Sequence, residues 1–274
     1  MNASQMLTTN YKGKVLSGLL HVNADDPTEF SIMYTYKGVK NKEFVLSLYW
    51  DYEQTEFLIN DSECALYTFS EDNESYTKVF NVKLNKKFES STHCLTVVVT
   101  EADYSAIKDY RQRVTMMYNF INDDSTQSKV MSPKIPYKTY TESFDYLNVL
   151  NSDLSDNLDS YITGDYRNID TNNRIIRAKS NSKLELSFRC SNFTGEGYQL
   201  MIVELNNKQV KIEDKPYLVY KLSPDFSTIY DKLIITTPSI PGEYILTSFS
   251  VPNPFEKGYL SNRKSFVTYK IIVQ

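Results

Sequence analysis

The chain has 274 residues, 41% of them apolar and 23% charged, which is enough for one large domain or two modest ones that each bury a core. Its net charge is −4 and its pI is near 5.4. A general nucleic-acid binder carries a basic excess that displaces counterions from phosphates, so we expect no nucleic-acid partner.

The aromatic composition predicts a β-rich protein. The chain has 22 Tyr and 14 Phe but one Trp, and tyrosine suits a half-buried pleated surface. Only 8 Gly are present, so Asn, Asp and Ser must make most of the turns.

No run of about 18 apolar residues occurs, so we expect no transmembrane segment. The first residues lack the charged segment and apolar core of a signal peptide. We expect an extracellular or cell-surface location if a leader has been removed, and a cytoplasmic one otherwise. Cys64 and Cys94 could form a disulfide that leaves Cys190 alone, but an odd cysteine count fits a reducing compartment equally well.

The first strand-rich block runs from about Lys14 to Thr100. Apolar residues alternate with other side chains in Phe30–Lys37 and again in Phe44–Trp50, which is the period of a half-buried strand. Further strands are expected over 55–59, 65–69, 76–84 and 93–100, separated by turn-forming clusters such as Asn60-Asp61-Ser62. Six or seven short strands at this spacing predict a sandwich.

The middle of the chain has a helical period. Its apolar residues fall at steps of three and four, with Thr100 as the helix cap: Ile107, Tyr110, Val114, Met117 and Ile121. This amphipathic helix, over about 101–121, either packs across the first sandwich or offers its apolar stripe to a partner. A proline-containing linker over 122–136 and a weaker helical stripe over 144–158 follow.

The second block begins near Arg174, with strands expected over 183–190, 198–205, 217–222, 232–236, 243–251 and 266–273. The run Pro241-Gly242-Glu243-Tyr244 and the apolar strand after it resemble the start of a late strand in an immunoglobulin-like or fibronectin-III-like sandwich. Val267, Tyr269, Ile271 and Val273 would form the closing strand.

That resemblance covers about the last 90 residues and implies a β-sandwich. The paired cysteines of true immunoglobulin domains are missing, because Cys190 has no partner in this block. The family transfers no catalytic residues, and it implies binding or assembly through the fold alone.

Candidate chemical motifs are sparse. The two histidines, His21 and His93, are far apart in sequence, and no C-x-x-C or H-x-x-x-H spacing accompanies them, so we predict no metal site. His93 and Cys94 are neighbours on a strand, so their side chains should diverge and both should be structural. The S-x-x-K spacing at 105–108 recurs at 75–78 and 180–183 and has no diagnostic value.

The segment 159–170 has the length of a calcium-binding loop. Tyr161 stands where a carboxylate is required, so we interpret the segment as a polar linker. No glycine-rich phosphate loop and no G-x-S-x-G motif occur. We therefore predict no enzyme activity, no catalytic residues and no cofactor.

One aromatic and acidic cluster is a candidate binding site. Trp50 shares its strand face with Phe44, Leu46 and Leu48 and should be core, whereas Tyr49 and Asp51 lie on the opposite face with Ser47. If that face is exposed, Tyr49, Asp51 and Tyr52, with Glu53 and Glu56, could bind a glycan or, with an acid and a second carboxylate across the glycosidic bond, cleave one.

The sequence thus predicts a mostly-β protein of two sandwich-like domains joined by a helical segment. The expected parts are residues 1–121, 122–173 and 174–274. The predicted function is non-enzymatic binding or assembly, with Tyr-rich strand faces recognising a protein partner. Two alternatives stay open: a structural, virion-type component that self-assembles, and a carbohydrate-binding protein that uses the Tyr49–Glu56 region.

Overall fold

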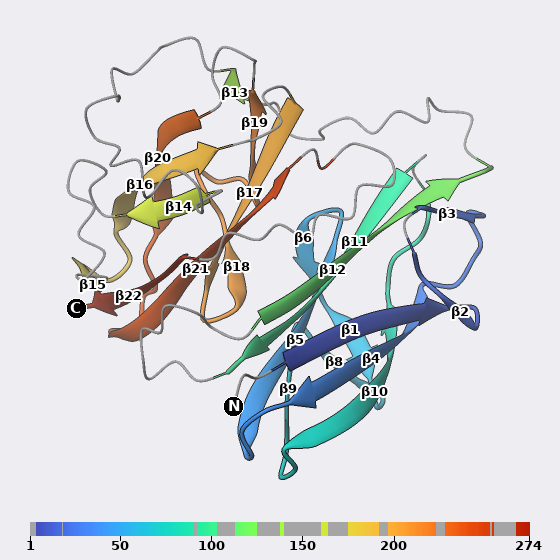
Figure 1. The fold of residues 1–274 in the computed structure, drawn as a ribbon. Helices are drawn as coiled ribbons and strands as arrows, with labels where there is room; N and C mark the ends of the chain where they lie inside the picture. The colour runs from blue at the N-terminus through green and yellow to red at the C-terminus, as the bar shows by residue number, and fades with distance from the viewer. Residues whose placement is uncertain are drawn as a thin grey trace. The chain divides into compact units, whose positions relative to one another are not determined.

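The fold is seen in a computed structural model, which describes residues 4–17, 19–89, 92–102, 113–124, 138–139, 160–163, 175–191, 197–222, 228–252, 254 and 267–274. These residues form strands and turns, drawn as arrows in Figure 1. None of the described segments is a helix long and apolar enough to cross a membrane.

The chain divides into two compact units. The first consists of Met1–Asp103, Arg111–Ser132 and Glu256–Asn262, and the second of Tyr104–Tyr110, Pro133–Phe255 and Arg263–Gln274.

The first unit contains two six-stranded sheets. Sheet A has the order β2-β1-β4-β10-β7-β8 and comprises β1 (Ser4–Tyr11), β2 (Lys14–Val15), β4 (Glu29–Lys37), β7 (Phe57–Ile59), β8 (Ser62–Cys64) and β10 (Ser75–Leu84). Sheet B has the order β3-β12-β11-β5-β6, and β9 also pairs with β5. Its strands are β3 (Leu19–Val22), β5 (Lys42–Trp50), β6 (Glu53–Thr55), β9 (Leu66–Glu71), β11 (Thr92–Glu101) and β12 (Arg113–Asn122).

The inner faces of sheets A and B share one apolar core. Ring pairs join the two sheets: Phe30 of β4 lies 5.9 Å from Phe120 of β12, and Tyr34 of β4 lies 5.4 Å from Phe44 of β5, between ring centroids. The inner residues of β4 are buried at every second position, as the period predicted. The first block is therefore a β-sandwich, as expected.

Its strand order is that of an immunoglobulin-type sandwich. In that fold strands A, B, E and D form one sheet and C, F and G the other. If β1, β4, β5, β7, β10, β11 and β12 are lettered A to G in chain order, sheet A has the neighbour order A-B-E-D and sheet B the order G-F-C. In addition, β3 pairs in parallel with β12, the last strand of the unit.

The predicted helix over 101–121 is wrong where the structure describes it. Residues 113–122 form β12, which pairs with β11 from Thr92↔Ile121 to Thr100↔Arg113. From Met117 onward every residue of β12 is buried, so its apolar side chains do not alternate with polar ones. A strand buried on both faces is a near-continuous apolar run, which also satisfies a helical period. The weaker stripe over 144–158 lies outside the described residues.

The second unit has a seven-stranded and a three-stranded sheet. The larger has the order β13-β19-β17-β21-β22-β15, with β18 paired to β17, and comprises β13 (Lys138–Thr139), β15 (Ile175–Ala178), β17 (Gly197–Leu205), β18 (Lys208–Val210), β19 (Leu218–Leu222), β21 (Gly242–Pro252) and β22 (Val267–Val273). The smaller has the order β14-β16-β20, with β14 (Ser160–Thr163), β16 (Lys183–Ser191) and β20 (Thr228–Thr236). One core cluster draws Leu186 and Leu233 from the smaller sheet and Met201, Leu246 and Ile271 from the larger.

The proline–glycine turn of this unit leads into β21, and Tyr244 ties the start of that strand to the turn. Tyr244, near the start of β21, donates its hydroxyl hydrogen to the carbonyl oxygen of Ile240 at 2.8 Å. A tyrosine that bonds back to the backbone just upstream marks the start of strand F in immunoglobulin-type folds. The next strand, β22, closes the sheet against β21 and pairs in parallel with β15 on its other side.

Most tight turns use asparagine and aspartate, as predicted from the small number of glycines. Two-residue turns with positive φ at both positions join neighbouring strands at Asp51-Tyr52 (53° and 70°), Asn60-Asp61 (49° and 62°) and Asn206-Asn207 (50° and 64°). Such turns match the twist of the flanking strands, and Asn and Asp tolerate their left-handed backbone.

Candidate functional site on the outer face of sheet A

The residues that the sequence offered as a binding site are mostly buried. Tyr49 is fully buried and Tyr52 is 3% exposed, and Ser47, on the face expected to be free, is also buried. Trp50 lies in the core, as predicted. The exposed second face on which the glycan hypothesis depended is therefore not present on β5, because both faces of this strand are buried.

Asp51 instead fastens the turn between β5 and β6 to β11. Its Oδ2 lies 2.9 Å from Nδ1 of His93, its Oδ1 accepts the backbone N–H of Cys94 at 2.9 Å, and its own N–H donates to the Cys94 carbonyl at 2.8 Å. The His93 ring stacks on Trp50, with centroids 5.0 Å apart. We call these contacts of Asp51 with His93 and Cys94 the clamp, because they hold the turn against β11.

Cys94 has the properties of a buried, unreactive thiol. Burial, and secondly the charge of Asp51, raise its pKa to about 12, so the thiol stays protonated at neutral pH. Cys94 lies on sheet B and Cys64 on sheet A, and both are free.

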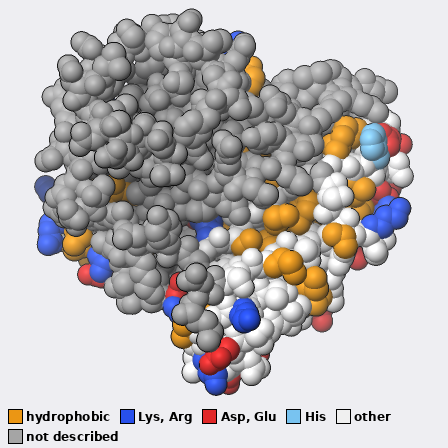
Figure 2. Space-filling model, in the orientation of Figure 1, with side chains coloured by type: hydrophobic (Ala, Val, Ile, Leu, Met, Phe, Trp, Pro, Cys, Tyr) orange, Lys and Arg blue, Asp and Glu red, His pale blue; other side chains and the backbone are white. Residues whose placement is uncertain are grey.

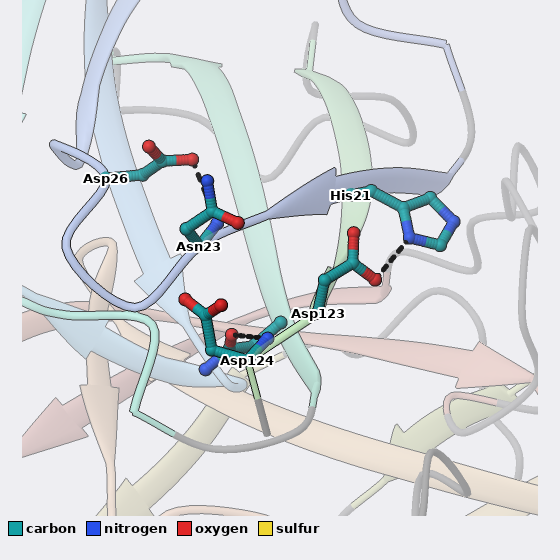
Figure 3. Close-up of polar contacts among 6 residues, drawn as sticks. His21, Asn23, Asp26, Asp123 and Asp124 are labelled. Carbon is teal, nitrogen blue, oxygen red and sulfur yellow. Dashed lines mark hydrogen bonds and ion pairs between the residues drawn. The ribbon is translucent and has the colours of Figure 1, made fainter. Parts of the chain in front are cut away.

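A second polar cluster surrounds the loop after β3 and the end of β12 (Figure 3). His21 Nδ1 lies 2.8 Å from Asp123 Oδ1. Asp124 Oδ2 accepts the backbone N–H of Ala24 at 3.0 Å. In the same loop Asp26 Oδ2 accepts the backbone N–H of Asn23 at 3.0 Å. The carboxylates thus bind backbone and histidine, and no group of metal-ligating side chains suited to an ion is found among the described residues.

Tyrosine is a core residue in this protein. Of the tyrosines whose side chains the structure describes, none is fully exposed, and Tyr67, Tyr76, Tyr198 and Tyr244 are the half-buried ones. The sequence-based idea of Tyr-rich recognition faces therefore does not hold in the described part of the chain. Large exposed apolar side chains are methionine, valine, leucine and isoleucine: Met6, Val15, Val39, Leu58, Val79, Ile175 and Ile240.

Two of these residues lie on the outer face of sheet A, where strand register arranges side chains in rows. Met33 of β4 is directly opposite Thr8 of β1 and Val79 of β10. In the next row Thr35 is opposite Met6 and Thr77, and its Oγ1 lies 3.0 Å from that of Thr77. Met6 and Val79 are 53% and 54% exposed. On the side shown in Figure 2, orange hydrophobic side chains of the first unit lie among white, uncharged surface.

A groove continues this face at one end. It has a volume of about 620 Å³, and its floor includes Asn10, Ser31 and Asn81, which form one cross-strand row. The turns Lys12-Gly13 and Asn60-Asp61 lie at its two sides. Within the described ranges, the amides of Asn10 and Asn81 make no side-chain hydrogen bond to the protein. Two amides and a hydroxyl are thus open to a ligand.

Charges lie at the ends of the face. On β4 the outward residues are Glu29, Ser31, Met33, Thr35 and Lys37. Glu29 pairs with Lys83 of β10 at 2.9 Å. Lys37 is exposed and makes no ion pair with any residue in the part of the chain that the structure describes. The result is an uncharged centre about three strands wide with an acidic group at one end and a free cation at the other.

This face was not predicted from the sequence, because β1 was not among the expected strands. The alternation of Leu7, Thr9 and Tyr11 with Met6, Thr8 and Asn10 was the available signal. Nothing local indicated that these outer residues lie beside those of β4 and β10.

Comparisons with known proteins do not assign a family. No protein-family model matches the sequence, and no curated protein matches it. Among solved structures, the C-terminal domain of the Streptococcus pyogenes antigen I/II-family protein AspA is 7% identical, with 98% of each chain covered and a TM-score of 0.29. The fibronectin(III)-like modules of Clostridium thermocellum CbhA are 10% identical, with 98% of this chain and 94% of that chain covered and a TM-score of 0.25. The periplasmic chaperone SfaE is 10% identical, covers 99% of this chain and 100% of its own, and has a TM-score of 0.26. Similarities this low do not indicate a function for this chain.

Proposed function

We propose that this chain is a non-enzymatic binding or assembly protein that docks a protein partner on the outer face of sheet A. One observation carries the proposal: three adjacent strands present an uncharged face in which Met6, Met33 and Val79 point outward. The outer face of a free sheet normally carries charged side chains, and exposed apolar surface rimmed by polar groups marks interaction sites.

The energetics favour a protein partner with a flat, uncharged surface. Covering a Met or Val side chain contributes about 1.5–3 kcal/mol relative to leaving it exposed. Met6 and Val79 are each about half exposed, so their burial provides part of that free energy. Methionine adapts its shape to the surface it meets, and the threonines beside it need no charged partner. A charged surface would lose hydration here without compensation.

Site-specific photo-crosslinking tests this proposal. A benzophenone side chain replaces Met33 at the centre of the face, and Val39, an apolar residue in a turn that is 61% exposed and thus more accessible than Met33, serves as the control position. We expect discrete covalent adducts from position 33 in extracts of the producing cell and none from position 39. Equal, diffuse labelling at the two positions would refute docking on this face.

The groove supports a second candidate function, binding of a neutral glycan. Unpaired amides and a hydroxyl in one row can both donate to and accept from sugar hydroxyls, and Leu58, which is 37% exposed, offers apolar contact beside them. Lys12 is paired with Asp26 at 2.5 Å and Lys83 with Glu29 at 2.9 Å, so the groove presents little uncompensated positive charge. This proposal moves the predicted carbohydrate site from the Tyr49–Glu56 region to sheet A.

A glycan array followed by NMR titration tests the second candidate. A binding saccharide should shift the side-chain amide signals of Asn10 and Asn81, and Asn10→Ala with Asn81→Ala should abolish binding. Asn73→Ala, in an exposed turn away from the groove, is the matched control. Binding that survives the double substitution would place the glycan elsewhere.

A further inference from the structure

The partner on this face, we infer, is a second copy of the same chain, packed face to face about a twofold axis that runs perpendicular to the strands. The inference rests on the proposed function, because it names the occupant of the same surface. It is carried by the order of side chains along β4.

The outward residues of β4 are complementary to the same residues in a second, antiparallel copy of the strand. Glu29 and Lys37 lie at the ends, Ser31 and Thr35 lie inside them, and Met33 is at the centre. A twofold axis perpendicular to the strands places β4 antiparallel to its copy, with Met33 against Met33. Glu29 then faces Lys37 of the second copy at both ends, and the small hydroxyl residues face one another.

The other face-to-face arrangement is unfavourable. A twofold axis along the strands would set Glu29 against Glu29 and Lys37 against Lys37, and like charges in an interface oppose association. Charge therefore selects the antiparallel arrangement. Lys37 has no ion-pair partner within its own described chain, so the second copy would supply one. Glu29, already paired with Lys83, would become the centre of a three-membered network.

The same axis superposes each neighbouring strand on its own copy. It sets β1 over β1 and β10 over β10, and Val79, in the row of Met33, meets Val79. Two sheets packed in this way lie about 10 Å apart, with strands about 30° from alignment, as in sandwiches. Three strands spaced about 4.8 Å apart and about nine residues long cover only about 14 Å by 30 Å. This is the low end of interface sizes, so we expect a reversible dimer at micromolar or higher concentration.

Sedimentation velocity of the full chain over a wide concentration range tests the dimer. We expect a monomer–dimer equilibrium that Met33→Lys abolishes, because the axis brings the two introduced cations together. Val39→Lys adds the same charge outside the face and should leave the equilibrium unchanged. Circular dichroism spectra of both variants verify that each is folded. A dimer that persists in Met33→Lys would refute the interface.

Charge reversal tests the arrangement itself. Glu29→Lys alone and Lys37→Glu alone each create two like-charge contacts and should weaken dimerisation by about tenfold. The double reversal restores two opposite-charge contacts and should recover the original dissociation constant. Lys83→Ala, which removes the partner of Glu29 within its own chain, should have an effect of less than about twofold. A double reversal as weak as the single ones would overturn the antiparallel arrangement.

The outcomes separate this inference from the proposed function. A chain that stays monomeric at all concentrations, while position 33 still crosslinks to a different protein, refutes the homodimer and leaves docking on sheet A intact. A monomeric chain without adducts at position 33 refutes both. Adducts whose mass is that of two copies of this chain support both.

Discussion

Replacing Asp51 with alanine should strongly destabilise the first unit. Asp51 has a φ of 53° and its side chain is 14% exposed, while the His93 side chain is 5% exposed. Alanine removes both oxygens that bond His93 and the Cys94 N–H. Each buried donor left unpaired costs about 1–3 kcal/mol, and alanine in left-handed backbone adds about 1–2 kcal/mol. We expect a loss of about 3–8 kcal/mol, a large part of the stability of a typical domain.

Asp51→Asn is the matched control. Asparagine tolerates the same backbone and keeps an oxygen for the Cys94 N–H, so only the charge and part of the His93 contact are lost. We expect this variant to lose about 1–2 kcal/mol. The order of the two variants, alanine far below asparagine, is the specific expectation.

Urea unfolding followed by tryptophan fluorescence measures both variants. Trp50 is the one tryptophan of the chain, it lies in the core of the first unit, and it stacks on the His93 ring. Its emission therefore reports this unit without signal from the other. The free energy of unfolding follows from linear extrapolation at constant slope. If alanine costs less than about 1 kcal/mol, or no more than asparagine, the clamp does not stabilise the turn as argued.

Three further predictions concern single groups. The pKa of Cys94 is raised to about 12 in the folded protein, so the neutral thiol contributes stability at low pH that is lost as pH rises from about 8.5 to 12. The variant Cys94→Ala should therefore show a flatter dependence of unfolding free energy on pH in this range. An unchanged slope would contradict burial of the thiol. Tyr244→Phe removes the bond to Ile240 and should cost about 0.5–1.5 kcal/mol, seen as faster amide exchange in β21 and β22; unchanged exchange would show that the bond is dispensable. Burial alone would raise the pKa of Asp26, but hydrogen bonds from Lys12 and a backbone N–H outweigh burial and lower this pKa. The ionised carboxylate therefore stabilises the fold above about pH 4, and this contribution is lost on acidification. NMR titration should show a higher Asp26 pKa in Lys12→Ala, and an unchanged value would exclude Lys12 as a cause.

Local patterns predicted much of the fold correctly. The alternation in 30–37 and 44–50 gave β4 and β5 nearly to the residue, because side chains on a strand point to opposite faces in turn. The turn at Asn60-Asp61 follows from the tolerance of these residues for positive φ. The Tyr244 corner is equally local, since its partner lies four residues upstream.

The candidate site was outside the reach of such patterns. Alternation says that a strand has two faces but does not say what covers each one, so it left open whether the second face of β5, with Ser47 and Tyr49, is exposed, and the structure shows that it is buried. For the same reason a helix was predicted where β12 forms, because a strand buried on both faces is a run of apolar residues that also fits a helical period.

The sequence alone therefore determined the β class, the two strand-rich blocks, the turn chemistry and the absence of a recognisable catalytic motif. Each of these depends on contacts between residues close in the chain or on composition. Only the tertiary structure joined Asp51 to His93, and only the pairing of β1, β4 and β10 aligned Met6, Met33 and Val79 on one face. These contacts connect residues far apart in sequence, and their register is set by the packing of the whole sandwich rather than by any local preference.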